Sequence, residues 1–214
     1  APTAGADGGQ PGGNIRNGFL FDSARVELVE GSLRRLGESD PAFEDSRKPL
    51  VARFRHLETG ARVTVFNLHL ASKRHQYSTF APDRPSFDSR ETQRIAQARL
   101  IREALLELHR EGHDYYVTGD FNDYEFSETL RTMLGDESTN LVDTLPAPER
   151  YDYIHRGTSE ALLHALVPRS LADAGRAEYE ILHGNELLGV APGTLGERAT
   201  DHAYGLARLR MGTG

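Results

Sequence analysis

The sequence predicts an α/β fold in which two mixed β-sheets form a sandwich flanked by helices. Two observations favour this fold class. Apolar runs with the period-two alternation of strands occur in pairs along the chain, and helical signals stand between some of the pairs. A doubly wound parallel sheet would instead alternate one strand with one helix throughout. The 214 residues are enough for one sizeable hydrophobic core.

Strands dominate the first third of the chain. Residues 1–13 are rich in Gly, Pro and Ala, and we expect them to form a flexible loop. In the third expected strand, Arg53 and Arg55 alternate with apolar residues, as in a half-buried strand. The expected strands are residues 18–21, 25–29, 49–57 and 62–70, with a turn at 58–61.

One long helix is expected after a loop at residues 73–87. Asp88 or Ser89 can cap its start, and Gly112 can end it. Its apolar residues fall on one stripe at helical spacing, namely Ala98, Ile101, Leu105 and Leu108.

The second half of the chain returns to short strands. Ser127 can cap a short helix that ends at Leu134, and an irregular stretch follows as far as Arg150. We then expect a hairpin through Gly157, strands near 162–167 and 178–183, a Gly-rich loop at 189–196 and a last strand at 204–209.

Composition narrows the classes of function. No apolar run approaches the roughly 20 residues of a membrane span, so no membrane-spanning segment is expected. The absence of cysteine excludes disulfides and thiolate metal sites. A net charge of −7 argues against binding nucleic acid by bulk electrostatics. It does not argue against a metal-dependent nuclease, which needs a local acidic cluster and a few local cations.

Polar residues close a strand at residues 119–122, Gly-Asp-Phe-Asn. The apolar run 115–118 precedes them, so Asp120 and Asn122 stand at a strand's carboxyl end, where α/β proteins place reactive groups. Both side chains leave the same face of an extended backbone and can reach one phosphate or one hydrated cation. The alternative is an Asx turn without a chemical role.

Histidines mark two further strand ends. The run 63–70 carries His69 near its end, and Asp201 and His202 precede the last apolar run. A lone histidine in an apolar run is more often a hydrogen-bonded core residue than a catalyst. Three polar groups at three strand ends nevertheless favour a common site over independent accidents.

In this order, the motifs resemble the endonuclease/exonuclease/phosphatase superfamily, whose fold is that of deoxyribonuclease I. The resemblance rests on residues 67–70 (Asn-Leu-His-Leu), 119–122 and 200–202 (Thr-Asp-His), and it spans residues 14–212 as one domain. Residues 11–21 and the hairpin 151–160 are most similar to bacterial, often secreted, nucleases. The resemblance therefore implies a secreted or cell-surface bacterial protein.

The resemblance also implies metal-dependent phosphodiester hydrolysis, with DNA or RNA as the substrate. His202 would deprotonate or orient the attacking water, while Asp120 and Asn122 would position that water and the phosphate. His69 would donate to a phosphate oxygen or to the leaving group. These four residues are the expected catalytic set.

Three further residues are implied as binding groups. Asp201 would contribute to a site for Mg²⁺ or Mn²⁺, which prefer oxygen ligands. Arg16 and Asn14 would contact the substrate, Arg16 at the nucleic-acid backbone. A solvated arginine without that role is the alternative for Arg16.

Two features depart from the family pattern. The family's principal metal-binding Glu lies upstream of the segment that residues 11–21 resemble, so the resemblance implies the C-terminal part of the usual domain, lacking its N-terminal strands, with that segment as a partner. Relatives also place an Asp, the partner of the catalytic His, where this chain has Leu163. Asp152, on the preceding hairpin arm, is the candidate replacement.

Two alternative functions remain open from the sequence. The same site could hydrolyse a small phosphorylated molecule or a lipid headgroup, which the superfamily also includes. Alternatively, Leu163 and the absent Glu are consistent with a catalytically degraded binding domain.

Overall fold

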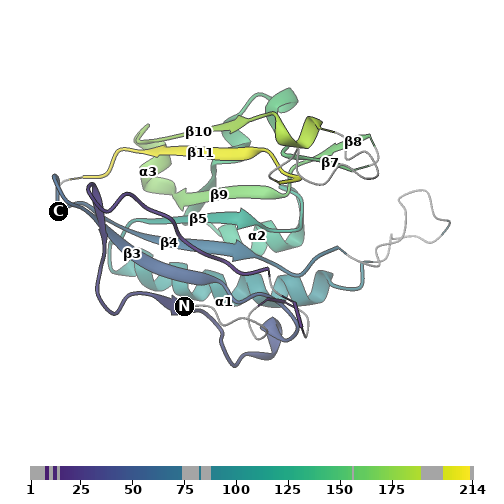
Figure 1. Cartoon of the computed structure of the whole chain (residues 1–214), viewed down its shortest axis with the longest axis horizontal. Helices are drawn as coiled ribbons and strands as arrows, with labels where there is room; N and C mark the ends of the chain where they lie inside the picture. Colours follow the sequence, from purple (N-terminus) through teal and green to yellow (C-terminus); the bar gives the residue numbers. More distant parts are fainter. Residues whose placement is uncertain are drawn as a thin grey trace.

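The computed structural model describes residues 8–9, 12–13, 15–73, 82, 88–155, 157–188 and 200–212. Its centre is a seven-stranded mixed sheet with the strand order β1-β3-β4-β5-β9-β6, in which β2 also pairs with β3 (Figure 1). The strands of this sheet are β1 (Val26–Leu28), β2 (Arg34–Arg35), β3 (Leu50–His56), β4 (Arg62–His69), β5 (Tyr115–Asp120), β6 (Ser138–Asn140) and β9 (Leu163–Pro168).

The parallel pair β4–β5 positions the site. Its connection runs through α1 (Glu91–Arg110), which returns the chain to the start of β5. The register places His69 directly opposite Asp120, because the carboxyl ends of both strands meet at one edge of the sheet. The other strand pairs of this sheet are antiparallel.

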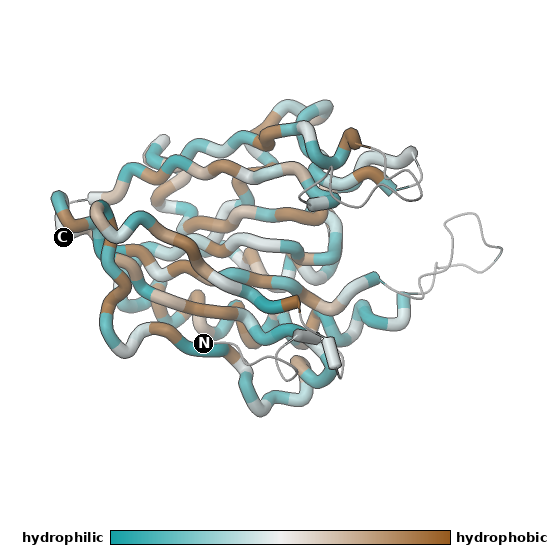
Figure 2. Tube along the Cα trace, viewed as in Figure 1, coloured by the Kyte–Doolittle hydropathy of each residue, from teal (hydrophilic) through white to brown (hydrophobic). Residues whose placement is uncertain are grey.

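Helices cover one face of the central sheet. Alternate residues of β4 and β5, such as Phe66 and Val117, point to this face and pack against the apolar stripe of α1. The short helix α2 (Glu128–Leu134) lies beside α1 and adds Leu130 and Met133 to the same core. Figure 2 shows the apolar residues concentrated along these strands.

A small two-stranded sheet covers part of the opposite face. It consists of the antiparallel pair β10 (Ala177–Leu182) and β11 (Tyr204–Leu209). Tyr179 of this sheet packs with Ala165 and Val167 of β9 in a second core. The helix α3 (Arg169–Asp173) connects β9 to β10 and contributes Leu171 to that core.

A hairpin links the two layers near the site. It is formed by β7 (Tyr153–His155) and β8 (Thr158–Glu160), and Tyr153 forms an isolated bridge with His202. Four 3₁₀ turns complete the described elements: η1 (Pro41–Phe43), η2 (Leu141–Thr144), η3 (Ala147–Glu149) and η4 (Asn185–Leu187).

The α/β class and most predicted elements are confirmed. The final strand has the predicted bounds, and Ser127 caps α2 by accepting a hydrogen bond from the Leu130 amide. The strand predicted at residues 18–21 is wrong. These residues form no strand, and Gly18 instead bonds through its carbonyl to the Asn67 side chain.

The structure matches some other predictions only in part, and some fall outside the described residues. Within the described residues, the second sheet has two antiparallel strands rather than a mixed set. Most of the predicted loops at 1–13 and 73–87, and the whole of the one at 189–196, lie outside the described residues. No helix in the described part of the chain is long and apolar enough to cross a membrane.

Candidate active site

Gly119 brings the ends of β4 and β5 into close contact. Its φ is +130°, and a Cβ at this position would lie 2.1 Å from the Leu68 carbonyl oxygen. Only glycine has no Cβ and adopts this conformation without strain. The close approach fixes His69 and Asp120 side by side, with His69 Nε2 3.3 Å from Asp120 Oδ2.

Asn122 forms a tight turn that holds the Asp120 carboxylate. It has a positive φ of 50°, which asparagine tolerates, and its backbone N–H donates to Asp120 Oδ1 at 2.8 Å. Its side-chain NH₂ donates to Asp120 Oδ2 at 3.1 Å and to the Leu70 carbonyl at 3.2 Å. The predicted Asx turn is therefore present, and it also orients a candidate catalytic carboxylate.

His202 is held by a buried carboxylate. Its Nδ1 lies 2.5 Å from Oδ2 of Asp152, whose side chain is fully buried. The other oxygen of Asp152 accepts from the backbone N–H groups of Leu162 (2.6 Å) and Leu163 (2.9 Å). The apolar residue at 163 does not leave His202 without a partner, because the Asp152 carboxylate contacts its Nδ1.

Asp120 lies between two imidazoles. The second nitrogen of His202, Nε2, is 3.8 Å from Asp120 Oδ2, on which His69 also converges. The structure thus brings together His69, Asp120, Asn122, Asp152 and His202 from segments more than 130 residues apart.

The environment shifts the pKa values of these groups in different directions. Burial raises the pKa of Asp120 to about 6, against the opposing charge of His202. Burial lowers the pKa of His69 to about 3, aided by the charges of Arg47 and His202, so His69 is neutral at pH 7. Burial also disfavours charged His202, but the Asp152 hydrogen bond and the nearby carboxylates outweigh it and raise the His202 pKa.

Two residues that sequence reasoning missed lie at this site. Arg47 donates to the backbone carbonyls of His69 (3.4 Å) and Leu70 (3.3 Å), so its cationic group stands next to the two strand ends. The ring of Tyr153 stacks on His202, with centroids 5.0 Å apart. Arg47 stands in none of the motifs, and Tyr153, although it belongs to the hairpin 151–160, reaches His202 only through the tertiary fold.

Three predicted binding residues are less closely connected to the site. Asp201 is exposed, and its charge contributes to raising the pKa of His202. Arg16 is exposed, and no contact within the described residues joins it to the histidines or Asp120. Asn14 lies outside the described residues. No group of three His, Asp or Glu side chains in the described part of the chain is arranged to hold a metal ion.

Solved structures share this fold. The chain is similar to the endonuclease/exonuclease/phosphatase from Bacteroides vulgatus, at 17% identity and a TM-score of 0.56, over 89% of this chain and 68% of that one. It is also similar to the mannosyl-6-phosphatase Bt3783 of Bacteroides thetaiotaomicron, at 15% identity and a TM-score of 0.55, over 87% of this chain and 67% of that one.

A third similar structure is D. rerio TDP2 complexed with a single-strand DNA product, at 14% identity and a TM-score of 0.54, over 86% of this chain and 68% of that one. The chain thus spans about two thirds of each of these proteins. No protein-family model and no curated protein sequence matches it. The chain has the fold of the endonuclease/exonuclease/phosphatase superfamily, as the sequence motifs predicted.

Proposed function

We propose that this chain is a metal-dependent phosphodiesterase that uses His202 as its general base. The observation that carries the proposal is the contact between His202 Nδ1 and the buried Asp152 carboxylate. Because that carboxylate can only accept, it fixes the tautomer with the proton on Nδ1 and leaves Nε2 able to take a proton. Two backbone N–H groups hold Asp152 in place, which gives the base a fixed direction.

The remaining residues act around this base. His202 Nε2 removes a proton from a water molecule, whose oxygen attacks the phosphorus while the bond to the leaving oxygen breaks. Asp120, 3.8 Å from Nε2, accepts a hydrogen bond from that water and orients it. His69 is neutral and donates a hydrogen bond to a phosphate oxygen or the leaving group, and Arg47 adds positive charge beside it.

The donor atoms at the site are carboxylate and amide oxygens, the type that a hard divalent cation prefers. The Asn122 NH₂ group is turned to Leu70 and Asp120, so its carbonyl oxygen, which accepts no bond within the described residues, faces away from them. Together with Asp120 and Asp201, it would hold Mg²⁺ or Mn²⁺, which bind through one or two carboxylates, water and substrate phosphate. When bound, the cation supplies positive charge to the phosphoryl oxygens.

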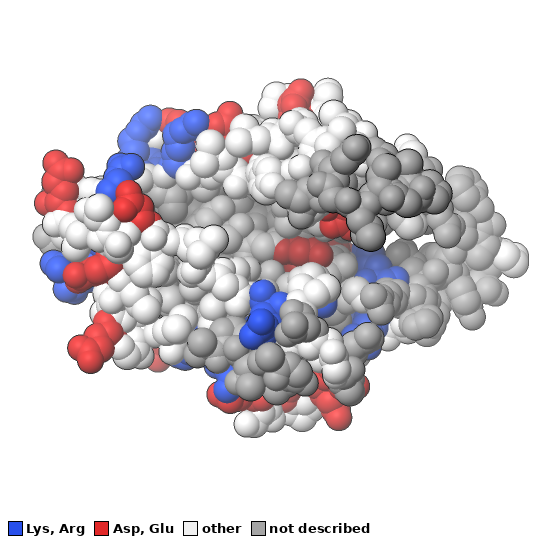
Figure 3. Space-filling view, in the orientation of Figure 1, with Lys and Arg blue, Asp and Glu red and all other residues white. Residues whose placement is uncertain are grey.

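We propose nucleic acid, DNA or RNA, as the substrate. A protein of the same fold, D. rerio TDP2, is described with a single-strand DNA product, which supports this choice. In the face shown in Figure 3, Lys and Arg form separate small groups rather than a broad stripe, so contacts would be few and local.

A small phosphorylated substrate is the second candidate. It is favoured by the similarity to a mannosyl-6-phosphatase and by the net charge of −7. The degraded binding domain is the weakest candidate, because one of its two arguments was the missing partner of His202, and Asp152 contacts His202 Nδ1.

Hydrolysis of four substrates by the 214-residue chain tests the proposal: single-stranded DNA, duplex DNA, RNA and a sugar phosphate, each with Mg²⁺ or Mn²⁺. We expect cleavage of a polymer, and a loss of about 10²-fold or more in His202→Ala. His109→Ala, which removes an exposed imidazole on α1, is the matched control and should retain activity. Cleavage of the sugar phosphate alone would favour the second candidate, and equal rates for His202→Ala and wild type would contradict the role of His202.

A further inference from the structure

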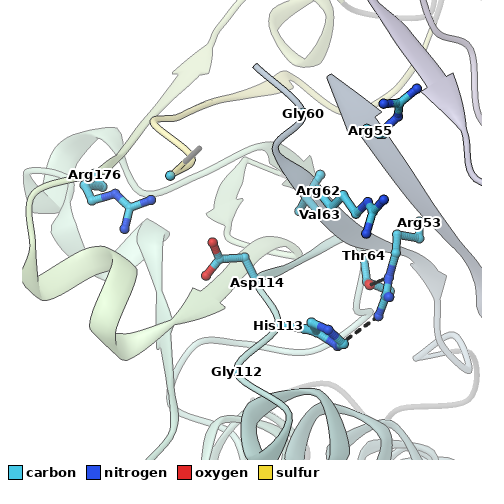
Figure 4. Close-up of a pocket in the computed structure, with 11 residues that line it drawn as sticks. Arg53, Arg55, Gly60, Arg62, Val63, Thr64, Gly112, His113, Asp114 and Arg176 are labelled. Carbon is cyan, nitrogen blue, oxygen red and sulfur yellow. Dashed lines mark hydrogen bonds between the residues drawn. The ribbon is translucent and has the colours of Figure 1, made fainter. Parts of the chain in front are cut away.

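A polar cavity lies at the opposite end of β4 from the candidate active site. It has a volume of about 540 Å³ and is formed around the amino-terminal ends of β4 and β5. Figure 4 shows Arg176 on one side and Arg53, Arg55 and Arg62 on the other. The length of β4, eight residues, separates this cavity from His69 by roughly 23 Å at about 3.3 Å per residue.

Like charges face each other in the wall of the cavity. In the antiparallel register of β3 and β4, Arg55 stands directly opposite Arg62, and Arg53 stands opposite Thr64. Like charges in directly opposed positions destabilise a sheet. Arg55 is neutralised by Glu27 on the neighbouring strand (2.6 Å), but no ion pair of Arg62 is formed within the described residues.

Two arginines are fixed in place by side-chain or backbone groups other than carboxylates. Arg53 contacts Thr64 Oγ1 (3.3 Å) and His113 Nδ1 (3.0 Å). Arg176 donates from Nε to the Arg210 carbonyl at 2.7 Å, which leaves the far side of its guanidinium directed into the cavity (Figure 4). Its Nη2 atom is buried and has no hydrogen-bond partner.

An unpaired buried donor is costly to leave in a protein and calls for an acceptor. Asp114 lines the cavity between the arginines but forms no ion pair with Arg176. Three arginines that form no ion pair within the described residues, Arg53, Arg62 and Arg176, therefore meet one lining aspartate, in a chain whose overall charge is −7. An anionic ligand with several acceptor oxygens would neutralise this excess of positive charge and bind the accessible part of the Arg176 guanidinium.

We propose that this cavity is an anion-binding site for phosphate groups, held chiefly by Arg62 and Arg176. The planar guanidinium fork matches two oxygens of one phosphate, and arginine is the residue typical of such recognition. The volume admits more than one phosphate group. The same chemistry is presented by a free polyphosphate and by the backbone of a nucleic acid.

This proposal does not depend on hydrolysis at His202. The two sites share no residue and stand at opposite ends of the same strands. Loss of catalysis therefore leaves the anion site testable, and failure of the anion site leaves the catalytic proposal intact.

Isothermal titration calorimetry in the presence of a chelator tests the site, with inorganic pyrophosphate and a 12-nucleotide single-stranded DNA as separate probes. We expect Arg62→Gln/Arg176→Gln to weaken pyrophosphate binding by about ten-fold or more, with a smaller loss for the exposed Arg62→Gln alone. Arg99→Gln/Arg131→Gln, which removes the same charge from the exposed surfaces of α1 and α2, is the control and should bind within two-fold of wild type.

The two probes distinguish the sources of phosphate. If DNA affinity falls with pyrophosphate affinity, and the slope of log K against log salt decreases by about one per arginine removed, the site binds a nucleic-acid backbone. If only pyrophosphate is affected, the ligand is a free polyphosphate. No pyrophosphate binding by wild type, or equal binding by the control and both cavity variants, would overturn the proposal. If the double variant fails to fold, pyrophosphate binding by Arg62→Gln alone still tests the proposal.

Discussion

Asp152 determines the direction in which His202 can act. Its two oxygens are divided between one imidazole and two backbone N–H groups. A buried carboxylate that accepts hydrogen bonds from three donors resists rotation. The orientation of His202 is therefore set before any substrate arrives.

Asp152→Asn should reduce hydrolysis by about 10²- to 10⁴-fold. An amide in this position can donate to His202 Nδ1, which moves the imidazole proton to Nε2 and removes the basic lone pair from the reacting side. The pKa of His202 should also fall, because its hydrogen bond to Asp152 and the Asp152 charge both raise it. The acid limb of the pH–rate profile, which reports loss of neutral His202 as pH decreases, should then move to lower pH.

Asp136→Asn is the matched control for Asp152→Asn, since it makes the same change at an exposed position. Leu163→Asp should not increase the rate, because a second carboxylate would be placed beside Asp152 and would destabilise the fold instead. A rate increase in Leu163→Asp would show that Asp152 does not serve His202.

Gly119→Ala tests the close contact between β4 and β5. The new Cβ would meet the Leu68 backbone oxygen, which cannot move without displacing His69 and its neighbours. We expect a loss of more than about 1 kcal/mol in the free energy of unfolding, measured with urea, together with reduced hydrolysis. Gly175→Ala is a useful control, because Gly175 also has a positive φ (+64°) but no atom within 4 Å of the added methyl group. An equal loss of unfolding free energy in the two variants would mean that the positive φ alone, without the clash, excludes other residues at position 119.

The ends of strands explain which site residues the sequence predicted. His69 and Asp120 follow apolar runs, so their positions could be inferred from patterning and their convergence from the resemblance to the superfamily. The parallel pairing that brings them together was seen only in the structure. Arg47 has no such context, since it lies in an irregular segment 22 residues before the carbonyl of His69 that it contacts. Asp152 was identified only as a candidate, because its approach to His202 depends on how the hairpin β7–β8 folds back.

At the scale of elements, α1 is anchored by a buried ionic cluster. Arg94, whose side chain is 1% exposed, contacts Asp88 and donates to Asp123 at 3.0 Å. Asp123 also accepts from Lys73 (2.9 Å) and Thr129 (2.7 Å). The cluster therefore joins α1 to the start of α2 and to the loop after residue 122.

Asp123→Asn should destabilise the fold by about 3 kcal/mol at pH 7, since it leaves the buried Arg94 with one partner fewer. Burial alone would raise the Asp123 pKa, but Lys73, Arg94 and Thr129 together lower it below its usual 3.8. A lowered pKa in the folded state stabilises the protein above about pH 4, and this contribution is lost as pH falls through the folded pKa. The difference in free energy of unfolding between wild type and variant should thus become smaller at acidic pH.

Chemical denaturation at pH 7 and at pH 3 measures that difference, with Asp173→Asn as the exposed control. A difference that stays constant with pH would show that Asp123 is not a charged partner of Arg94.

Element length decided which parts of the fold could be predicted. The helix α1 has 20 residues and an apolar stripe, and its pattern is unambiguous. The strand β6 has three residues, Ser-Thr-Asn, and no apolar alternation. It forms because neighbours hold it, for example through the bond between Ser138 and Tyr115 Oη (2.8 Å), and a local pattern cannot report such a contact.

At the scale of the whole molecule, the candidate active site is assembled by two layers. The central sheet carries His69 and Asp120, and the chain leading into β11 of the small sheet carries His202. The second core, which includes Tyr179 and Leu171, holds these layers together. A cation bound by Asp120, Asn122 and Asp201 would connect the same two layers.

Cation binding should therefore stabilise the whole fold as well as enable hydrolysis. We expect activity only with Mg²⁺ or Mn²⁺, complete loss in excess chelator and recovery when the cation is restored. A ligand present at 100 times its Kd adds about 2.7 kcal/mol to the free energy of unfolding, so saturating Mn²⁺ should raise the thermal midpoint of wild type by several degrees. Asp120→Asn should lose this increase, because it removes a charged oxygen donor, whereas Asp136→Asn should keep it. Undiminished hydrolysis in chelator, or an equal shift of the midpoint in Asp120→Asn, would place the cation outside this site.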